Sequence, residues 1–586
     1  MLDPYKMVFV NVFCFLLLIL SLLFYRYIYP KRKIHLVVVL LLLSLLPLIS
    51  SLRKGSYESG DLVNHVKIAM EFMQPLSEGI FFPRSSTITC EGYGCPDFIF
   101  MYLLPPYSIN FFHFLGLSFI ASVKLFLAVT FIGSGITMYL WIKETIGKVP
   151  AFVGALFYLY APYHLVDMHF RSDVGEMASY AILPLAFLFT QKIIENKKFH
   201  WYILFGITLS VLILSHQAIS LTSLPFILLY GIFLWFQTKQ KNLKTLLYYS
   251  FATVYGLALS CFYWVPILYE AKYMFWGVHG DISFVPLQQL LYSPWRYGLL
   301  FQGHNGELSF VVGYIHLLMI MLAFYFLVRK KIITKNKNYL LFFLISFFTL
   351  FFLMQSSSFL FWKYIPIIKS IQYSYRLLLL TSVFTSFIAA IVVTRIKNKQ
   401  IVIGICCLVV ATTLLNWGNR KSLPEINDVS IKKQLLTIDP GKGSLTRPIW
   451  VGEGDIYWDS PRPKTRLEVI TGNAVIRQIY LTSARHEYLV STKTKTFFKE
   501  NSFYFPGWIV MVNDQQYPIT YTFPKYPGLI TFTLPQGIYK VEVAFIDTVD
   551  RKISKIISAF TLFLSMSSLL FISLKKIPIK KRWSEK

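Results

Sequence analysis

Long apolar runs alternate with short polar stretches along most of the chain. A helix of about 20 apolar residues is long enough to cross the roughly 30 Å hydrocarbon core of a bilayer. Such runs predict membrane-spanning helices at 7–26, 34–52, 119–142, 149–166, 177–195, 201–218, 219–237, 245–267, 309–328, 339–354, 377–395, 401–416 and 552–574. The pattern therefore predicts an α-helical multi-span membrane protein with about 13 transmembrane helices.

Three of the intervening segments, 53–118, 268–308 and 417–551, are too long to be simple turns. Long loops are where binding and catalytic residues concentrate. We divide the chain into a transmembrane domain, a separate polar domain, and a final transmembrane helix with a basic tail. These units are residues 1–416 (with outer loops at 53–118, 167–176 and 268–308), 417–551 and 552–586.

Residues 417–551 contain no membrane-spanning run. Short stretches there mix β-branched and aromatic residues and are separated by Pro and Gly, which is typical of strands. Examples are 466–470, 519–522, 529–534 and 539–546. This pattern predicts an extracytoplasmic β-sandwich near the C-terminus. His486 is the only histidine in it and cysteine is absent, so it lacks the ligands for a three-His zinc site.

Composition agrees with a membrane protein. Of the 586 residues, 55% are apolar and only 15% are charged, with a mean hydropathy of +0.54. A soluble domain has nearer a quarter of its residues charged, so an ordinary soluble enzyme and a disordered chain are both excluded.

The net charge of +28 is concentrated in alternate short loops and the C-terminal tail. These segments hold 26 Lys and Arg but three Asp and Glu, which accounts for +23 of the total. By the positive-inside rule they face the cytoplasm. We therefore expect a multi-pass protein of the cell (plasma) membrane, with the N-terminus outside, the C-terminus cytoplasmic, and the long loops and polar domain extracytoplasmic. Because the membrane accounts for the charge, no nucleic-acid partner is expected.

Cys90 and Cys95 lie close together in one of the outer loops. On an oxidising outer face they either form a small disulfide loop or remain two free thiols. The sequence leaves both alternatives open.

A first group of polar residues follows the second predicted span. Asp61 and His65 are four residues apart and share one face of a predicted amphipathic helix that continues through Phe72. The simplest interpretation of Asp61 is a helix N-cap, a frequent role of Asp before an amphipathic run. The alternative is a carboxylate available for chemistry at the outer membrane surface.

A second group, around Arg171, Asp173 and Glu176, follows the fourth predicted span. An Arg beside carboxylates can bind an anionic group while the carboxylates orient a hydroxyl or a metal. The alternative is an ion network that only holds the turn together. His216 and Arg376 are predicted at the outer ends of other spans, where such residues also commonly reach toward headgroups.

Several motifs resemble one known family. They are the run from Tyr93 to Tyr107, Gly60-Asp61 with His65, Leu159 to Tyr163 with Arg171 and Glu176, Ser215-His216, and Gln372 with Arg376. Together they resemble the bacterial polytopic membrane proteins called 6-pyruvoyl-tetrahydropterin synthase-related, and the arrangement is similar to the GT-C superfamily of membrane glycosyltransferases. Phe503 to Trp508 looks like part of the outer β-domain of related proteins.

The resemblance implies an inverting glycosyltransferase that moves a sugar from a polyprenyl-phosphate or polyprenyl-diphosphate donor to a cell-envelope acceptor. Asp61 matches the acidic residue of the first outer loop and would be the catalytic base. His65, Arg171, Asp173, Glu176, His216 and Arg376 are the expected residues for binding donor phosphate or substrate. The identity of the sugar, the acceptor and any divalent cation is left open by the sequence.

Two other classes of function compete with this one. A transporter or lipid flippase would normally carry ionisable groups near the bilayer midplane, whereas the polar clusters here gather at one membrane edge. A noncatalytic cell-envelope scaffold would account for residues 417–551, but it leaves Asp61 and the Arg171 group without a role.

Overall fold

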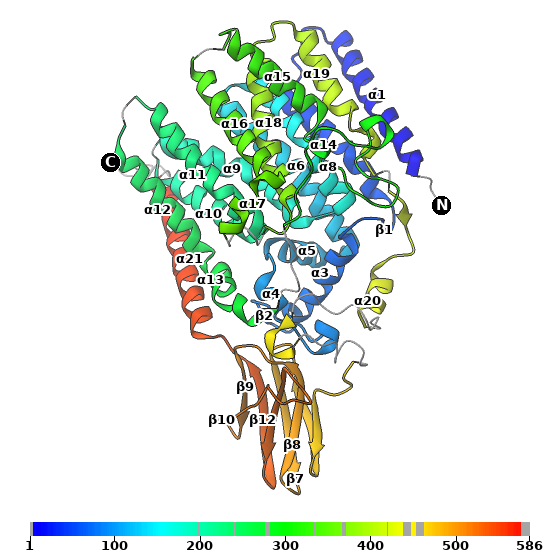
Figure 1. Ribbon diagram of the computed structural model, residues 1–586, viewed down its shortest axis with the longest axis vertical. Helices are drawn as coiled ribbons and strands as arrows, with labels where there is room; N and C mark the ends of the chain where they lie inside the picture. The colour runs from blue at the N-terminus through cyan, green and yellow to red at the C-terminus, as the bar shows by residue number, and fades with distance from the viewer. Residues whose placement is uncertain are drawn as a thin grey trace, which may run out of the picture.

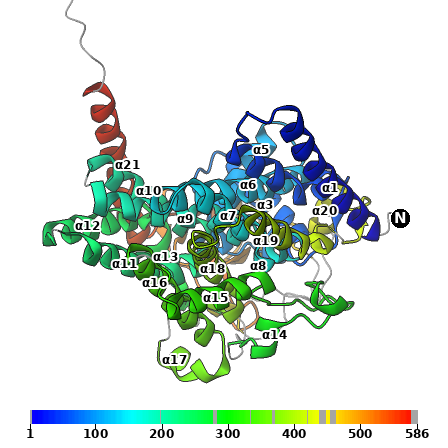
Figure 2. The same ribbon diagram turned by 90° about the horizontal axis from the view of Figure 1, so that it is seen from above.

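A computed structural model describes residues 4–196, 198–239, 241–275, 282–332, 334–365, 371–418, 420–436, 447–452 and 462–575. A body of helices lies above a sheet region that projects from one end (Figure 1). Viewed from above, the first helix, α1, and the last, α21, lie on well-separated sides of this body (Figure 2).

Eight helices of the described residues, some with an adjoining turn, are long and apolar enough to cross a membrane unbent. They are α1 (Pro4–Ile28), α6 (Phe119–Thr145), α9 (Val174–Asn196), α11 (Gln217–Gln237), α16 (Thr334–Leu353), α18 (Leu378–Val393), α19 (Lys399–Ala411) and α21 (Val549–Lys575). α18 has no charged residue and is buried throughout, so it forms the centre of the body.

Two further apolar helix pairs are bent, and three apolar helices are shorter. α7 (Lys148–Leu159) continues at 47° into α8 (Pro162–Val166) and η3 (Asp167–Arg171), and α12 (Leu243–Leu259) continues at 72° into α13 (Cys261–Glu270) and η4 (Ala271–Tyr273). The shorter helices are α2 (Leu36–Leu45), α10 (Phe199–Ser215) and α15 (Tyr314–Val328). Each expected span overlaps one of these helices, and the total of thirteen spans stays a prediction.

The smaller helices are α3 (Leu62–Ser77), α4 (Asp97–Phe100), α5 (Leu104–Phe114), α14 (Leu287–Leu291), α17 (Phe359–Tyr364) and α20 (Asp428–Leu436). Of these, α3, α4, α5 and α20 lie toward the sheets (Figure 1). α3 is amphipathic as expected, because Leu62, Val66, Ala69 and Phe72 are fully buried along one stripe.

The sheet region contains two antiparallel sheets that share one hydrophobic core. The larger sheet has the order β10-β9-β12-β7-β6, and the smaller has the order β11-β8-β5. The strands are β5 (Leu467–Thr471), β6 (Ala474–Leu481), β7 (Arg485–Thr492), β8 (Thr496–Phe503), β9 (Trp508–Val512), β10 (Gln515–Tyr517), β11 (Leu529–Leu534) and β12 (Gly537–Phe545). Expected strands at 466–470, 529–534 and 539–546 match β5, β11 and β12, whereas 519–522 forms only a bridge between Thr520 and Thr531.

Several contacts join the part of the chain after α19, which includes the sheet region, to the outer loops before it. Two-residue strands pair across the chain, β1 (Ser56–Tyr57) with β3 (Ser422–Leu423) and β2 (Met274–Phe275) with β4 (Arg447–Pro448). Cys90 and Cys95 form a disulfide, so the disulfide alternative is confirmed. The loop that it closes presents Tyr93, which stacks on Phe503 with ring centroids 5.0 Å apart.

Candidate functional site

Asp61 is held beside the end of the bent helix η3 by backbone hydrogen bonds. The amide of Gly60 donates to the carbonyl of Phe170, and the amide of Asp61 donates to the carbonyl of Arg171, both at 2.8 Å. The first outer loop and the second are therefore joined at the two residues that the sequence singles out, Asp61 and Arg171.

The carboxylate of Asp61 does not cap the helix that follows it. Asp61 occupies the N-cap position of α3, but its side chain accepts no cap hydrogen bond. Ser59 Oγ instead accepts a hydrogen bond from the amide of Leu62 at 3.2 Å. The carboxylate interacts with Asn64 and His65. Burial raises the pKa of Asp61, against the opposing effect of His65, and burial lowers the pKa of His65. Such a carboxylate is a suitable proton acceptor.

Arg171 is the centre of a buried ion network. Its Nη1 donates to Asp167 Oδ1 at 2.6 Å, to the Tyr163 hydroxyl at 2.7 Å and to Glu176 Oε1 at 2.9 Å, and its Nη2 donates to Asp173 Oδ2 at 2.8 Å. Every member of this network is more than nine-tenths buried. An isolated charge at such a site is very costly, so each charge depends on its partners.

Asp173 has a second, structural contact. Its Oδ1 accepts hydrogen bonds from the amides of Gly175 and Glu176 at 3.0 and 2.9 Å, so it caps the N-terminus of α9. The residue before it, Ser172, is in the left-handed conformation with φ +57°, and its hydroxyl lies 2.9 Å from the Tyr57 hydroxyl. Asp173 therefore positions the turn and Arg171 in addition to lining the site.

Arg376 approaches the network from another helix and is less enclosed. Its Nε donates to Glu176 Oε1 at 3.1 Å, and its Nη1 donates to the carbonyl of Ile371 at 2.9 Å. Its Nη2 donates to none of the described residues, and 12% of the side chain is exposed. Arg376 therefore retains hydrogen-bonding capacity for an anion, and it is more exposed than Arg171, whose side chain is 8% exposed.

His216 and Tyr102 form an aromatic wall of the site. Their rings stack with centroids 5.4 Å apart, and the ring of His65 lies 6.4 Å from that of Tyr102. Gly175 makes this approach feasible. A Cβ at position 175 would lie 2.8 Å from His216 Cδ2 and 3.0 Å from both Ser215 O and Tyr102 Cε1.

The structure brings the expected site residues into one cluster. Asp61 and His65 come from the first outer loop, Arg171, Asp173 and Glu176 from the second, and His216 and Arg376 from two further helix ends. Their chemical roles stay predictions. Sequence reasoning did not single out Tyr102, Tyr163 or Asp167; the spacing of Asp167 and Arg171, four residues apart, is a usable signal for that ion pair.

Three side chains of the cluster are spaced to bind a cation. Donor atoms of Asp173, Glu176 and His216 all lie within 4.8 Å of one another. However, the same two carboxylates already pair with Arg171 and Arg376 at 2.8 to 3.1 Å. Two guanidinium charges at these distances oppose the entry of a divalent cation, so the donor set does not fit a metal well.

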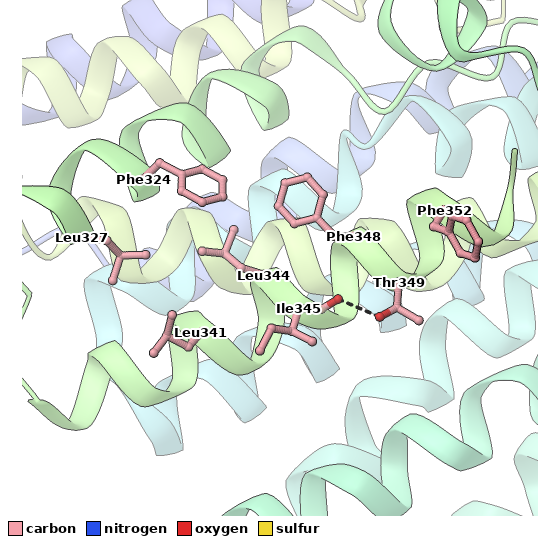
Figure 3. A pocket seen from close by; sticks show the side chains of 8 residues that line it. All are labelled: Phe324, Leu327, Leu341, Leu344, Ile345, Phe348, Thr349 and Phe352. Atoms are coloured by element: carbon pink, nitrogen blue, oxygen red, sulfur yellow. Dashed lines mark hydrogen bonds between the residues drawn. The ribbon is translucent and has the colours of Figure 1, made fainter. Parts of the chain in front are cut away.

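An apolar groove of about 510 Å³ lies between α15 and α16. Figure 3 shows the side chains that line it: Phe324, Leu327, Leu341, Leu344, Ile345, Phe348, Thr349 and Phe352. Several of them face outward, including Ile345, which is 66% exposed. The groove ends at Phe352, two residues before Met354, whose carbonyl accepts a hydrogen bond from Ser374 Oγ. Ser374 begins the turn that carries Arg376.

Comparison with solved structures finds two cryo-EM structures of the arabinofuranosyltransferase AftD from Mycobacteria. They are 14% and 11% identical to this chain, with TM-scores of 0.44 and 0.36, and each match covers 65% of this chain and 27% of AftD.

Comparison of sequences finds an uncharacterized protein of Lactococcus lactis subsp. cremoris (strain MG1363). It is 20% identical over 263 residues, which is 44% of this chain and 43% of that protein, so the chain spans less than half of its relative.

A family model covers more of the chain. The model for the 6-pyruvoyl-tetrahydropterin synthase related domain, described as a membrane protein, matches residues 101–419. That range contains Arg171, Glu176, His216 and Arg376, whereas Asp61 precedes it. The match extends over more than half of the 586 residues, and the chain therefore belongs to the 6-pyruvoyl-tetrahydropterin synthase-related family of membrane proteins.

Proposed function

We propose that this protein is a membrane glycosyltransferase of the GT-C type, which moves a sugar from a polyprenyl-phosphate or polyprenyl-diphosphate donor to an acceptor in the cell envelope. The carboxylate of Asp61 is the observation that carries the proposal. It stands at the start of α3 without capping it, and it is held by backbone bonds next to a cluster with two arginines. A helix that needed only a cap would use this carboxylate for it.

Asp61 acts as the general base in a single displacement. It accepts the proton of the acceptor hydroxyl while the hydroxyl oxygen forms a bond to the anomeric carbon of the donor sugar. The bond from that carbon to the phosphate oxygen breaks at the same time, and its electron pair leaves with the lipid phosphate. One direct displacement inverts the anomeric configuration.

Arg376 stabilises the negative charge that develops on the leaving phosphate. Its Nη2 is uncommitted among the described residues, and a preorganised cationic donor is most effective where water is partly excluded. Arg171 is instead a positioning residue, because its described hydrogen bonds connect Asp167, Asp173, Glu176 and Tyr163. His65, His216 and Tyr102 line the space between these groups. No step of this reaction requires a metal.

The groove between α15 and α16 receives the polyprenyl chain of the donor. Its lining is apolar and partly exposed, and its end at Phe352 leads toward the turn that bears Arg376. A lipid chain in the groove would therefore have its phosphate end directed toward the arginine.

The orientation proposed for the protein follows from the charge distribution. The basic loops face the cytoplasm of a plasma-membrane protein with thirteen spans, and the two sheets form a β-sandwich on the outside. The site then lies at the outer end of the helices, where lipid-linked donors and envelope acceptors meet.

The proposal is tested with purified protein in liposomes that contain a panel of radiolabelled polyprenyl-phosphate and polyprenyl-diphosphate sugars. Transfer of label to a water-soluble or envelope acceptor, with release of unlabelled lipid phosphate, supports a glycosyltransferase. Movement of intact labelled lipid between leaflets without cleavage would instead identify a flippase. Neither transfer nor movement, in folded protein that still binds envelope polymer, would indicate a scaffold.

A further inference from the structure

Arg84, in the first outer loop, has a largely buried guanidinium that makes no hydrogen bond with the described residues. Its Nε and Nη2 are buried and donate to none of the described residues, and 12% of the side chain is exposed. Its nearest acidic atom is Asp547 Oδ1, 3.7 Å from Nη2. A buried charge that makes no hydrogen bond is costly, and such a group in a folded protein points to a missing partner.

The acidic groups around Arg84 are engaged by other cations. Glu270 is paired with Arg551, with Nε to Oε1 at 2.9 Å and Nη2 to Oε2 at 3.0 Å, and Asp547 Oδ2 is bonded to Lys555. Three cations and two carboxylates meet here, so the group has a net charge of +1. Although burial lowers the pKa of Arg84 to about 10, its guanidinium is charged at neutral pH.

This cluster lies where a membrane span begins. α21 contains the candidate span Val549–Leu570, and Arg551 and Lys555 are in its first two turns. The apolar residues beside Arg84 face outward, with Phe81 71% and Phe82 37% exposed. Phe82 also contacts Phe262 of α13, with ring centroids 5.6 Å apart, and Lys555 lies 4.8 Å from its ring centre.

The same cluster fastens the sheet region to the helices. Arg551 Nη2 donates to the carbonyl of Pro506 at 3.0 Å and its Nη1 to the carbonyl of Ile546 at 3.4 Å. Both carbonyls flank strands of the larger sheet, β9 and β12. An anion at Arg84 would therefore complete the charge balance of the junction between α13, α21 and the sheets.

We propose that Arg84 and Lys555 bind the phosphate of an anionic membrane lipid, at a site separate from the Asp61 cluster. The net positive charge of the cluster attracts an anion. The start of a membrane span lies at the depth of the lipid headgroups, and the exposed phenylalanines provide an apolar surface for the lipid chain. The ligand chemistry is a lipid phosphate, supplied either by an anionic phospholipid or by a polyprenyl phosphate. The site does not depend on the proposed transferase activity.

The test is lipid retention measured by native mass spectrometry on full-length, delipidated protein. Phosphatidylglycerol and polyprenyl phosphate are titrated separately, with phosphatidylcholine as the zwitterionic reference, into wild type, Arg84→Gln and Lys552→Gln. Lys552 is an exposed cation on the same helix and serves as the matched control. We expect one high-affinity phosphatidylglycerol on wild type and on Lys552→Gln, and about tenfold weaker retention on Arg84→Gln, because a charge-assisted contact is lost. Polyprenyl phosphate also fits the donor site proposed near Arg376, so its titration is scored by the second lipid bound, which Arg84→Gln alone should lose.

The lipid that shows this difference identifies the natural source of the phosphate. Equal retention of both lipids by all three proteins would overturn the proposal. If Arg84→Gln does not fold, the thermal unfolding of wild type tests the site instead. A larger rise in Tm with an anionic lipid than with phosphatidylcholine supports the proposal, and an equal rise overturns it.

Discussion

The hydroxyl of Ser59, and not the carboxylate of Asp61, accepts the hydrogen bond of the first amide of α3. This arrangement separates helix stability from the chemistry proposed for Asp61. Ser59→Ala should destabilise the protein by about 1 kcal/mol and leave sugar transfer nearly unchanged, because it removes only a cap. Asp61→Asn should leave the melting temperature nearly unchanged and lower transfer at least about 100-fold, because it removes the base.

The two variants are each other's controls when thermal unfolding and transfer are measured on the same samples. A large loss of stability in Asp61→Asn, or a loss of transfer in Ser59→Ala that exceeds its loss of folded protein, would contradict the separation.

The two arginines of the site should respond differently to substitution. Arg171→Met leaves the buried carboxylates Asp167, Asp173 and Glu176 without their shared partner, so we expect a loss of about 3–5 kcal/mol in the free energy of unfolding. Arg376→Gln should cost less stability, because Glu176 keeps its bond to Arg171, but should lower transfer about 100-fold. Thermal unfolding and steady-state transfer measure the two effects, and equal destabilisation by both variants would argue against this division of roles.

Gly175 sets the position of the aromatic wall. Gly175→Ala should lower transfer and cost about 1–3 kcal/mol, because the new Cβ would be 2.8 Å from His216 and 3.0 Å from the Ser215 carbonyl. The matched control is Gly133→Ala in α6, where the nearest atom is 3.6 Å away at Ala181 Cβ. That control should retain full transfer, and parallel loss in both variants would show that the effect is not local.

Stability should depend on pH through Glu71 of α3. Burial, followed by the nearby Asp97, raises the pKa of Glu71 to about 8. Because the folded state holds this proton more tightly than the unfolded state, the stabilisation is complete below about pH 4.3, the ordinary pKa of Glu, and is lost as the pH rises through 8. Glu71→Gln should therefore gain stability over wild type at pH 9 and very little at pH 4. A gain that is the same in thermal scans at both pH values would refute this.

The sequence predicts the helical body well because hydropathy is a local signal. Every expected span overlaps an apolar helix, and the amphipathic stripe of α3 is buried as its spacing indicates. The strands were harder to predict, since β7 and β9 pair with β12, and β8 pairs with β11, across other strands of the chain. The extent of the polar domain and its orientation stay predictions.

Within the site, residue types and membrane-edge positions identified the cluster but not the work of each member. Asp173 caps α9, and Ser59 instead of Asp61 accepts the first amide hydrogen bond of α3. Both contacts depend on side-chain geometry, which residue spacing does not specify. Tyr102 was missed because a tyrosine near a membrane surface is ordinary in sequence, and only its stacking on His216 distinguishes it.

The central claim is that Asp61 removes a proton from an acceptor during sugar transfer from a lipid-linked donor. The most direct measurement is single-turnover transfer from the best radiolabelled polyprenyl-linked donor by wild type, Asp61→Asn and Ser59→Ala, each with and without EDTA, with the anomeric configuration of the product determined. The account predicts inverted product from wild type and Ser59→Ala, insensitivity to EDTA, and almost no product from Asp61→Asn. Undiminished transfer by folded Asp61→Asn would contradict it.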